Sequence, residues 1–309
     1  MSEKTEKFSQ SFYGNGKLLL SAEYFVLDGA LSLALPTKFG QSLHVQENSY
    51  QLISWKSFDE KKQLWFEVFF SLKNFQIIQT NNLSIAKRLS QILSTAQKLN
   101  PSFLQKGFDV KTELTFPKAW GLGTSSTLIY MIAKWAKVNE FVLLEKTFGG
   151  SGYDIACAGA ERSILYHKEN GKPTWEYCDF KPSFADQLFF IYLGKKQNSR
   201  EGIEHYRKMG HRSGTIEALT ALTHQMVKCQ ALNDFEKIIV EQESIISNTL
   251  NLSKAKDLYF QDYWGSIKSL GAWGGDFVMA TSNRTEKETK DYFNKKRFEV
   301  FLRYEDLIK

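Results

Sequence analysis

The chain has 309 residues, of which 42% are hydrophobic and 14% aromatic, and this is enough for two well-filled cores. Its net charge of +6 comes from 40 basic and 34 acidic residues spread along the sequence, which favours an anionic small molecule at least as readily as a nucleic acid. No basic block resembles a nucleic-acid arm, no run approaches the roughly 18 apolar residues of a membrane helix, and residues 1–10 lack a signal-peptide core. We therefore expect a cytoplasmic monomer or homodimer without a nucleic-acid or membrane partner.

Cysteine and histidine usage gives no sign of a disulfide framework or a zinc centre. The three cysteines, Cys157, Cys178 and Cys229, are few and widely spaced. The five histidines form no HExxH motif or other paired spacing. We expect the cysteines to be small buried residues.

The first half of the chain predicts strands, a helix and then another strand. Residues 12–35 form two short apolar segments around the insertion Gly14-Asn15-Gly16-Lys17, with Asp28-Gly29 as a hairpin-type turn, and this predicts a β-hairpin. Apolar residues recur at helical spacing over residues 84–99. Further strands are expected at 41–47, 50–55, 63–70 and 107–116, the third with one apolar face made by Leu64, Phe66, Val68 and Phe70.

The second half mixes short strands with long helices, which predicts an α+β protein. Lys181-Pro182 is the expected boundary between a domain of residues 1–180 and a domain of residues 181–309. Helices are expected at 125–138, 155–162 and over the long region 215–250, and strands at 163–167, 174–180, 187–193 and 277–281. One more helix and a short strand follow.

The stretch FPKAWGLGTSSTL, residues 116–128, joins a predicted strand to a predicted helix. Gly121 and Gly123 would let the backbone approach an anion, while N–H groups of the first helical turn point at it. The alternative is a tight turn in which Ser or Thr caps the helix. Two further glycine-rich turns occur, at 149–152 and 271–275, but the sequence has no GxxxxGK[ST] motif and no GxGxxG motif that opens a βαβ unit.

Three motifs together resemble those of the GHMP kinase superfamily. They are Gly16-Lys17 with Glu23, Gly121-Leu-Gly-Thr-Ser125, and Lys268-Ser-Leu-Gly-Ala-Trp-Gly-Gly275. Their order and spacing agree over almost the whole chain, and the details are closest to the mevalonate-pathway branch. The resemblance implies a two-domain fold, with an N-terminal domain like domain 2 of ribosomal protein S5 and a C-terminal ferredoxin-like α/β sandwich. It also implies that the protein uses ATP and Mg²⁺ as cofactors.

The resemblance implies a role for three residues of the first motif. Lys17 would lie near the transferring phosphoryl group, where a cation stabilises charge. Glu23 and Tyr24 match positions that the family uses for the substrate. Without the resemblance, Lys17 reads as an exposed lysine at a strand start and Glu23 as a surface carboxylate on a hairpin.

Asp154 follows the second glycine turn, where mevalonate-type members carry an aspartate that accepts or orients the acceptor proton. Lys17 close by would keep it ionised. Ser151 of the same turn is expected to contact the acceptor. An aspartate that only caps a helix is the alternative interpretation.

The central loop is expected to bind ATP and the metal ion. The implied ATP contacts are Gly121, Leu122, Gly123, Thr124, Ser125, Ser126, Gly271, Gly274 and Gly275. Ser125 aligns with the serine that holds Mg²⁺, whereas Ser126 stands where the family usually has alanine or glycine. The position of the family's glutamate ligand is Leu143 in this chain, so Glu145 is the expected replacement. The alternative is that Glu145 is only a surface helix residue.

The loop of residues 194–200 resembles the substrate-side loop of mevalonate-pathway kinases. Lys196, Ser199 and Arg200 would suit an acidic acceptor, although a solvated basic loop has the same composition. In the third motif Trp273 replaces a usual glycine, so it either packs the turn or restricts the phosphate pocket.

These features predict an ATP-dependent kinase for an acidic isoprenoid precursor. Trp120 before Gly-Leu-Gly, Gly-Ser-Gly-Tyr-Asp154 and Gly-Gly-Asp276 resemble phosphomevalonate kinase more than mevalonate kinase. Mevalonate kinase is the first alternative. A kinase for a sugar or another alcohol, a related decarboxylase and a non-catalytic ligand-binding protein of the same fold also stay open.

Overall fold

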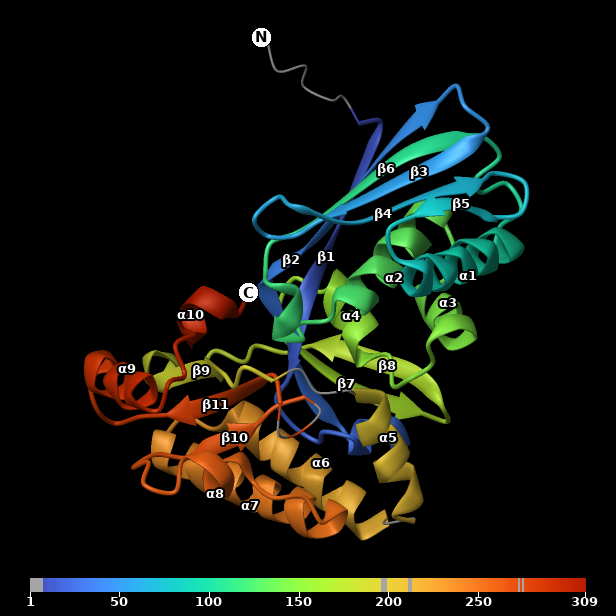
Figure 1. Ribbon diagram of the computed structural model, residues 1–309. Helices are drawn as coiled ribbons and strands as arrows, with labels where there is room; N and C mark the ends of the chain where they lie inside the picture. Colours follow the sequence, from blue (N-terminus) through green and yellow to red (C-terminus); the bar gives the residue numbers. More distant parts are fainter. Residues whose placement is uncertain (1–7, 196–198, 211–212, 272, 274) are drawn as a thin grey trace. The chain divides into compact units, whose positions relative to one another are not determined.

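The computed structural model describes residues 8–195, 199–210, 213–271, 273 and 275–309, and of residues 199, 200 and 213 only the backbone (Figure 1). Contacts within the chain divide it into two compact units. Unit 1 comprises Met1–Gly16, Phe39–Lys118 and Gly123–Gly159, and unit 2 comprises Lys17–Lys38, Ala119–Leu122 and Ala160–Lys309. The chain therefore changes unit inside the central glycine loop. The domain division at residue 180 stays a prediction.

Unit 1 is a mixed sheet with helices on one face (Figure 1). Its strands follow the order β5-β4-β3-β6-β2, in which β3 and β6 are parallel and the other neighbours antiparallel. The strands are β3 Leu52–Phe58, β4 Leu64–Ser71, β5 Ile77–Thr80, β6 Gly107–Leu114 and the second part of β2, Ser32–Asn48. The helices are α1 Leu83–Leu99, α2 Thr124–Ala136, α3 Glu140–Thr147 and α4 Tyr153–Gly159.

The core of unit 1 fixes where α2 lies. β4 alternates as predicted, with Phe66, Val68 and Phe70 buried, whereas Leu64 at the strand start is 44% exposed. α1 begins after Asn82, whose side chain accepts a hydrogen bond from the Ile85 N–H. The buried faces of α1 and α2 then pack on the sheet through Leu89, Ile92, Leu93, Ile129, Ile132 and Ala133.

Unit 2 contains two sets of strands. The start of β2 pairs with β7 Ile164–Glu169, which pairs with β8 Lys172–Tyr177. A separate antiparallel sheet has the order β10-β11-β9-β12, and its strands are β9 Leu188–Tyr192, β10 Ile267–Ser269, β11 Phe277–Thr281 and β12 Phe301–Arg303. β1, Gln10–Leu19, pairs with β2 and, like β2, runs through both units.

The helices of unit 2 complete its core. They are α5 Ser199–Lys208, α6 Ser213–Lys228, α7 Leu232–Leu250, α8 Ala255–Tyr259, α9 Glu286–Lys295 and α10 Tyr304–Leu307. α6 and α7 lie side by side (Figure 1). Phe189 and Ile191 of β9 pack in one cluster with Ala255 of α8 and Phe293 of α9.

The structure confirms the α+β class and most predicted elements. The long helical region is two helices, the helix expected at 155–162 ends at Gly159, and β5, β10, α5, α8 and α10 were not predicted. The turn expected at Asp28-Gly29 was wrong, because a 3-10 helix, Phe25–Asp28, ends there between β1 and β2. Cys157 is buried as expected, whereas Cys178 and Cys229 are half-buried, and all three are free thiols. Within the ranges given above, no helix combines the length and apolar character needed to cross a membrane.

Candidate functional site

The predicted phosphate loop runs into an uncapped helix start in unit 1. Gly123 is the N-cap of α2 and has a left-handed backbone, with φ 97° and ψ 38°. No described side chain caps this helix, so a Ser-capped or Thr-capped turn is not what forms here. The first helical bond runs from the Thr127 N–H to the Gly123 carbonyl at 3.0 Å. The N–H groups of the first turn therefore have no partner within the helix, and the positive end of its dipole lies with them.

The same helix start contacts the predicted acceptor-side carboxylate. Ser126 is buried in the first turn of α2 and donates a hydrogen bond to Asp154 Oδ2. Asp154 lies in the first turn of α4, and its Oδ1 accepts a hydrogen bond from the Ile155 N–H at 3.0 Å. The neighbouring Ser125 is exposed. Ser126 was expected as an ATP contact and as a departure from the family's small residue, and its contact with Asp154 was not predicted.

The other half of the loop lies in unit 2 beside Lys17 and Asp276. The Lys17 N–H donates to the Leu122 carbonyl at 2.9 Å, and its ammonium donates to the Gly121 carbonyl at 3.2 Å. Gly121 has φ +69°, and a Cβ there would lie 2.3 Å from the Asp276 carboxyl group. Glycine is therefore required at this position. Since Asp154 belongs to unit 1, its expected proximity to Lys17 stays a prediction.

Two tryptophans near the glycine turns of unit 2 serve packing. The Trp120 ring meets Phe277 edge to face, with centroids 5.6 Å apart. Trp273 is 3% exposed and packs in an apolar cluster with Tyr24 and Phe25. Its φ of +46° is rare for a bulky residue. Of the turn's predicted ATP contacts, Gly271 and Gly275 are described, whereas Gly274 lies outside the described residues.

The residues predicted to bind the acceptor come from both units. Tyr24 stacks on Tyr206 of α5 with ring centroids 6.0 Å apart. Ser151 is half-buried in the turn before α4. Of the remaining predicted contacts, Lys196 lies outside the described residues. Ser199 and Arg200 begin α5, and only their backbone is described. The roles of all these residues stay predictions.

Unit 1 offers the oxygen donors that Mg²⁺ prefers, namely the Asp154 carboxylate and the hydroxyls of Ser125 and Ser126. Leu143 is fully buried, while Glu145, two residues on, is exposed on α3. Within the described parts of the chain, no group of three or more His, Cys, Asp or Glu side chains could hold a metal ion. A Mg²⁺ site at these donors and Glu145 as its ligand both stay predictions.

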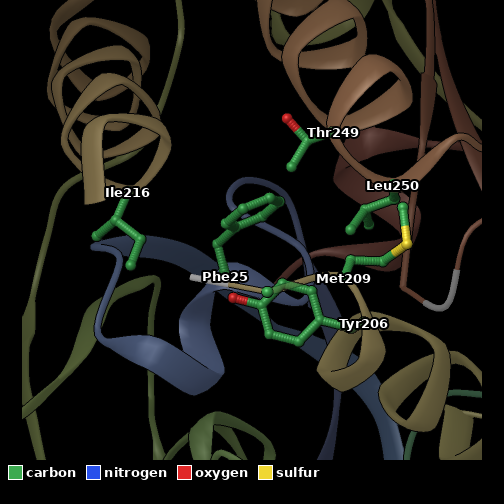
Figure 2. A pocket seen from close by; sticks show the side chains of 7 residues that line it. Phe25, Tyr206, Met209, Ile216, Thr249 and Leu250 are labelled. Carbon is green, nitrogen blue, oxygen red and sulfur yellow. The ribbon is translucent and has the colours of Figure 1, made fainter. Parts of the chain in front are cut away.

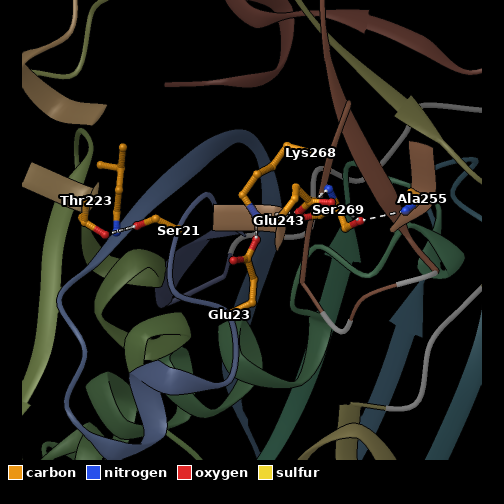
Figure 3. Close-up of polar contacts among 8 residues, drawn as sticks. Ser21, Glu23, Thr223, Glu243, Ala255, Lys268 and Ser269 are labelled. Carbon is orange, nitrogen blue, oxygen red and sulfur yellow. Dashed lines mark hydrogen bonds and ion pairs between the residues drawn. The ribbon is translucent and has the colours of Figure 1, made fainter. Parts of the chain in front are cut away.

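A buried ion cluster in unit 2 was not predicted (Figure 3). The Lys268 ammonium bonds one carboxylate oxygen of Glu23 and lies 3.2 Å from Glu243 Oε1. Glu243 in turn accepts hydrogen bonds from the Ser269 N–H at 3.1 Å and the Ser269 hydroxyl at 2.9 Å. The side chains of Glu23 and Lys268 are fully buried and that of Glu243 is 3% exposed. Glu23, expected as a substrate contact or a surface carboxylate, is thus an internal ion-pair partner.

The cluster has unusual proton affinities. Burial raises the pKa of the Glu243 carboxyl to about 7, against the opposing charge of Lys268. Burial likewise raises the pKa of Glu23. Burial alone would lower the pKa of Lys268, but the charges of Glu23 and Glu243 outweigh it and raise the pKa above its ordinary value. Lys268 is therefore charged at neutral pH, where Glu243 changes its protonation state.

One sequence signal points to this cluster. Phe235, Ile239 and Ile246 form the buried stripe of α7, and Glu243 stands at a position of that stripe where an apolar residue is expected. A charged side chain on a buried helix face needs a partner. The sequence does not say which lysine supplies it.

A small pocket lies beside the Tyr24-Phe25 segment in unit 2 (Figure 2). It is lined mainly by apolar side chains, among them Phe25, Tyr206 and Leu250. Its free volume of about 10 Å³ has room for about one water molecule. Tyr206 also donates a hydrogen bond to Asp28 Oδ2 at 2.6 Å. This pocket is a packing gap and is too small for an acceptor molecule.

Comparison with models of protein families gives no match for this sequence, and comparison with curated protein sequences gives none. Solved structures are similar over nearly the whole chain. Methanococcus jannaschii mevalonate kinase is 16% identical with a TM-score of 0.70, and the match covers 94% of this chain and 96% of that one. Streptococcus pneumoniae phosphomevalonate kinase in complex with phosphomevalonate and AMPPNP is 14% identical with a TM-score of 0.70, over 95% and 99%.

A galactokinase extends the comparison beyond the mevalonate pathway. The Lactococcus lactis enzyme complexed with galactose is 12% identical with a TM-score of 0.64, and the match covers 93% of this chain and 88% of that one. The further assignment of the two domains to S5-like and ferredoxin-like architectures stays a prediction. These structural neighbours are GHMP kinases, and the chain has their fold, as its three motifs predicted.

Proposed function

We propose that the chain is an ATP-dependent phosphotransferase of the GHMP type whose acceptor is phosphomevalonate. The observation that carries this proposal is the hydrogen bond from Ser126 to Asp154 in unit 1. It joins the predicted acceptor-side carboxylate to a helix start whose N–H groups suit a phosphate. The fold shared with mevalonate and phosphomevalonate kinases supports the same function.

Each part of the loop has a role in this proposal. The N–H groups at the start of α2 would bind phosphate oxygens of ATP. Bound Mg²⁺, held by Ser125 and the phosphates, would neutralise part of their charge. Lys17, whose ammonium contacts the Gly121 carbonyl, would stabilise charge on the transferring phosphoryl group. Asp154 would orient the acceptor for in-line attack.

The acceptor is proposed from details of the motifs. Trp120 before Gly-Leu-Gly and Asp276 after Gly-Gly resemble phosphomevalonate kinase. A phosphate monoester oxygen is already ionised, so its attack does not need a base, and Asp154 would then act by positioning. With mevalonate, the hydroxyl proton would pass to Asp154 as the oxygen attacks the γ-phosphorus and ADP leaves.

An assay with purified protein tests the proposal. ATP and Mg²⁺ are supplied with either phosphomevalonate or mevalonate, and ADP release and product mass are measured. We expect turnover with phosphomevalonate and a product that is heavier by one phosphoryl group, without CO₂. Turnover with mevalonate but not with phosphomevalonate would show that the acceptor is mevalonate. Release of CO₂ would indicate a decarboxylase. ATP binding without turnover on any acceptor would contradict the proposal and indicate a binding protein.

Substitution of Asp154 tests its role in the same assay. Asp154→Ala should lower kcat about 100-fold or more, since it removes the group that orients the acceptor. Asp154→Asn should retain more activity than Asp154→Ala with phosphomevalonate, because an amide still accepts the Ser126 hydrogen bond. The matched control is Asp234→Ala, an aspartate on α7 whose side chain is 63% exposed. Equal activities of Asp154→Ala and Asp234→Ala would remove Asp154 from the mechanism.

A further inference from the structure

Glu23 sits in a strained turn in unit 2. The residues on both sides of it have left-handed backbones although neither is glycine, Ala22 with φ 57° and Tyr24 with φ 65°. The Phe25 N–H closes the turn on the Glu23 carbonyl at 2.8 Å. Such conformations persist only where the surroundings hold them, and they cluster at functional sites. The turn follows the strand that carries Lys17.

The buried ion cluster adds a polar contact to this turn, whose Ala22 and Tyr24 also pack in the apolar cluster with Trp273. The Lys268 ammonium donates one hydrogen bond to the Glu23 carboxylate and another to the backbone carbonyl of Ser269, the latter at 3.0 Å. Glu243 on α7 fixes Ser269 through two further hydrogen bonds. Ser269 ends β10, and the third glycine turn begins at Gly271. The cluster therefore ties the turn around Glu23 to the base of the third glycine turn, and both lie in unit 2.

We propose that Lys268 is a positioning residue that holds the Ala22 to Tyr24 turn in its strained form against the base of the third glycine turn. The role rests on the proposed phosphotransferase function, because these turns carry the predicted acceptor and ATP contacts. Lys268 itself is fully buried, so we place it behind these turns and not among the groups that would meet a ligand.

Stability alone does not account for the cluster. Desolvation of a buried ion pair offsets much of its attraction, so apolar replacements of similar volume are often as stable as the original. Glu23 Oε2 also lacks a hydrogen-bond partner, as far as the structure is described, which adds to the cost. A geometric role explains why three ionisable groups occupy a place where leucine and methionine would pack.

The test replaces the whole cluster at once. Lys268→Met alone should destabilise the protein, because it leaves two carboxylates buried together. The triple variant Glu23→Leu, Lys268→Met, Glu243→Leu should recover most of the melting temperature. We expect its kcat to stay about 10- to 100-fold below that of the wild type, since the turns lose their alignment. Recovery of both stability and kcat in the triple variant would show a purely structural cluster and overturn the proposal.

Hydrogen exchange of residues 20–28 gives a readout that does not depend on activity. These amides should exchange faster in the triple variant than in the wild type. The matched control is Lys256→Met, a lysine of the same unit that bonds the Gly265 carbonyl at 2.7 Å and should leave this segment unchanged. Unchanged exchange in a stable triple variant would overturn the proposal for Lys268, whether or not the wild type is an active enzyme. A wild type that transfers no phosphoryl group would refute only the proposed function.

A milder variant covers the case in which the triple variant does not fold. Glu243→Gln keeps the Lys268 contact with Glu23, and its amide oxygen still accepts the hydrogen bond of the Ser269 N–H, so both kcat and the protection of residues 20–28 should be retained. Loss of either one in a folded Glu243→Gln protein would contradict the assignment of the positioning role to the pair of Lys268 and Glu23.

Discussion

Glu243→Gln should make the stability of the protein less dependent on pH. Burial raises the pKa of this carboxyl from 4.5 to about 7, while the nearby charge of Lys268 opposes the change. The folded protein therefore keeps the proton on Glu243 up to about pH 7, whereas the unfolded chain releases it near pH 4.5. Between these values, unfolding releases a proton. The free energy of unfolding must therefore fall as the pH rises through this window.

The size of the effect follows from the same two pKa values. At about 1.4 kcal/mol for each pH unit, the interval from 4.5 to about 7 corresponds to a loss of about 3 kcal/mol by pH 8. Glutamine is uncharged at every pH and close in shape, so the variant avoids this loss. At pH 5 the two proteins should differ little, because Glu243 is then protonated in the folded state.

Urea unfolding at pH 5, 6, 7 and 8 measures this difference. Other groups titrate in the same range, but they do so in both proteins, so the wild-type value is subtracted from the variant value at each pH. The difference should grow in favour of Glu243→Gln as the pH rises. Parallel curves would show that Glu243 does not titrate between pH 5 and 8, and a difference that grows toward acid would show that its pKa is lowered rather than raised.

Two further substitutions test the loop and the helix start. Gly121→Ala should lower the free energy of unfolding by about 1 to 3 kcal/mol and weaken ATP binding measured by calorimetry, because its Cβ would lie 2.3 Å from Asp276. The control is Gly171→Ala, which has a similar φ of +77° but open space around the Cβ. It should lower stability less and leave ATP binding unchanged. Equal effects would exclude the clash as the cause. Thr127→Val should cost about 1 to 3 kcal/mol in urea unfolding, because it removes the 2.7 Å hydrogen bond to buried Gln41. The matched control is Thr95→Val, a half-buried threonine whose hydroxyl bonds the Gln91 carbonyl, and a loss no larger than that of the control would contradict this reasoning.

The elements that the sequence predicts well carry their signal within themselves. The helical spacing at residues 84–99 and the apolar run at 277–281 match α1 and β11 to within a residue. The sequence did not predict the break between α6 and α7. The N-cap of α7 is Ala231, which makes no side-chain capping hydrogen bond, and the segment between the two helices contains no Gly or Pro. A boundary without such residues leaves little local trace.

The pairing of charges in the buried cluster, by contrast, could not be predicted from the local sequence. Lys268 and Glu23 are 245 residues apart, and their pairing depends on how unit 2 folds as a whole. The resemblance to GHMP kinases placed Glu23 on the substrate side, and Lys268 entered only as the first residue of a glycine motif. A family motif identifies positions, but the environment of a side chain decides whether it faces a ligand or the core.

The contacts of Asp154 bear on the role that this residue has in the proposed enzyme. Both carboxylate oxygens already accept a hydrogen bond, one from Ser126 and one from the Ile155 N–H. These bonds hold the carboxylate in one orientation, which suits a group that aligns an acceptor more than one that must move toward a hydroxyl proton. Ser126 stands where the resembled family usually has alanine or glycine, so this second bond is a feature of this chain. The arrangement therefore supports a positioning role for Asp154, and the assay with phosphomevalonate and mevalonate tests which acceptor it positions.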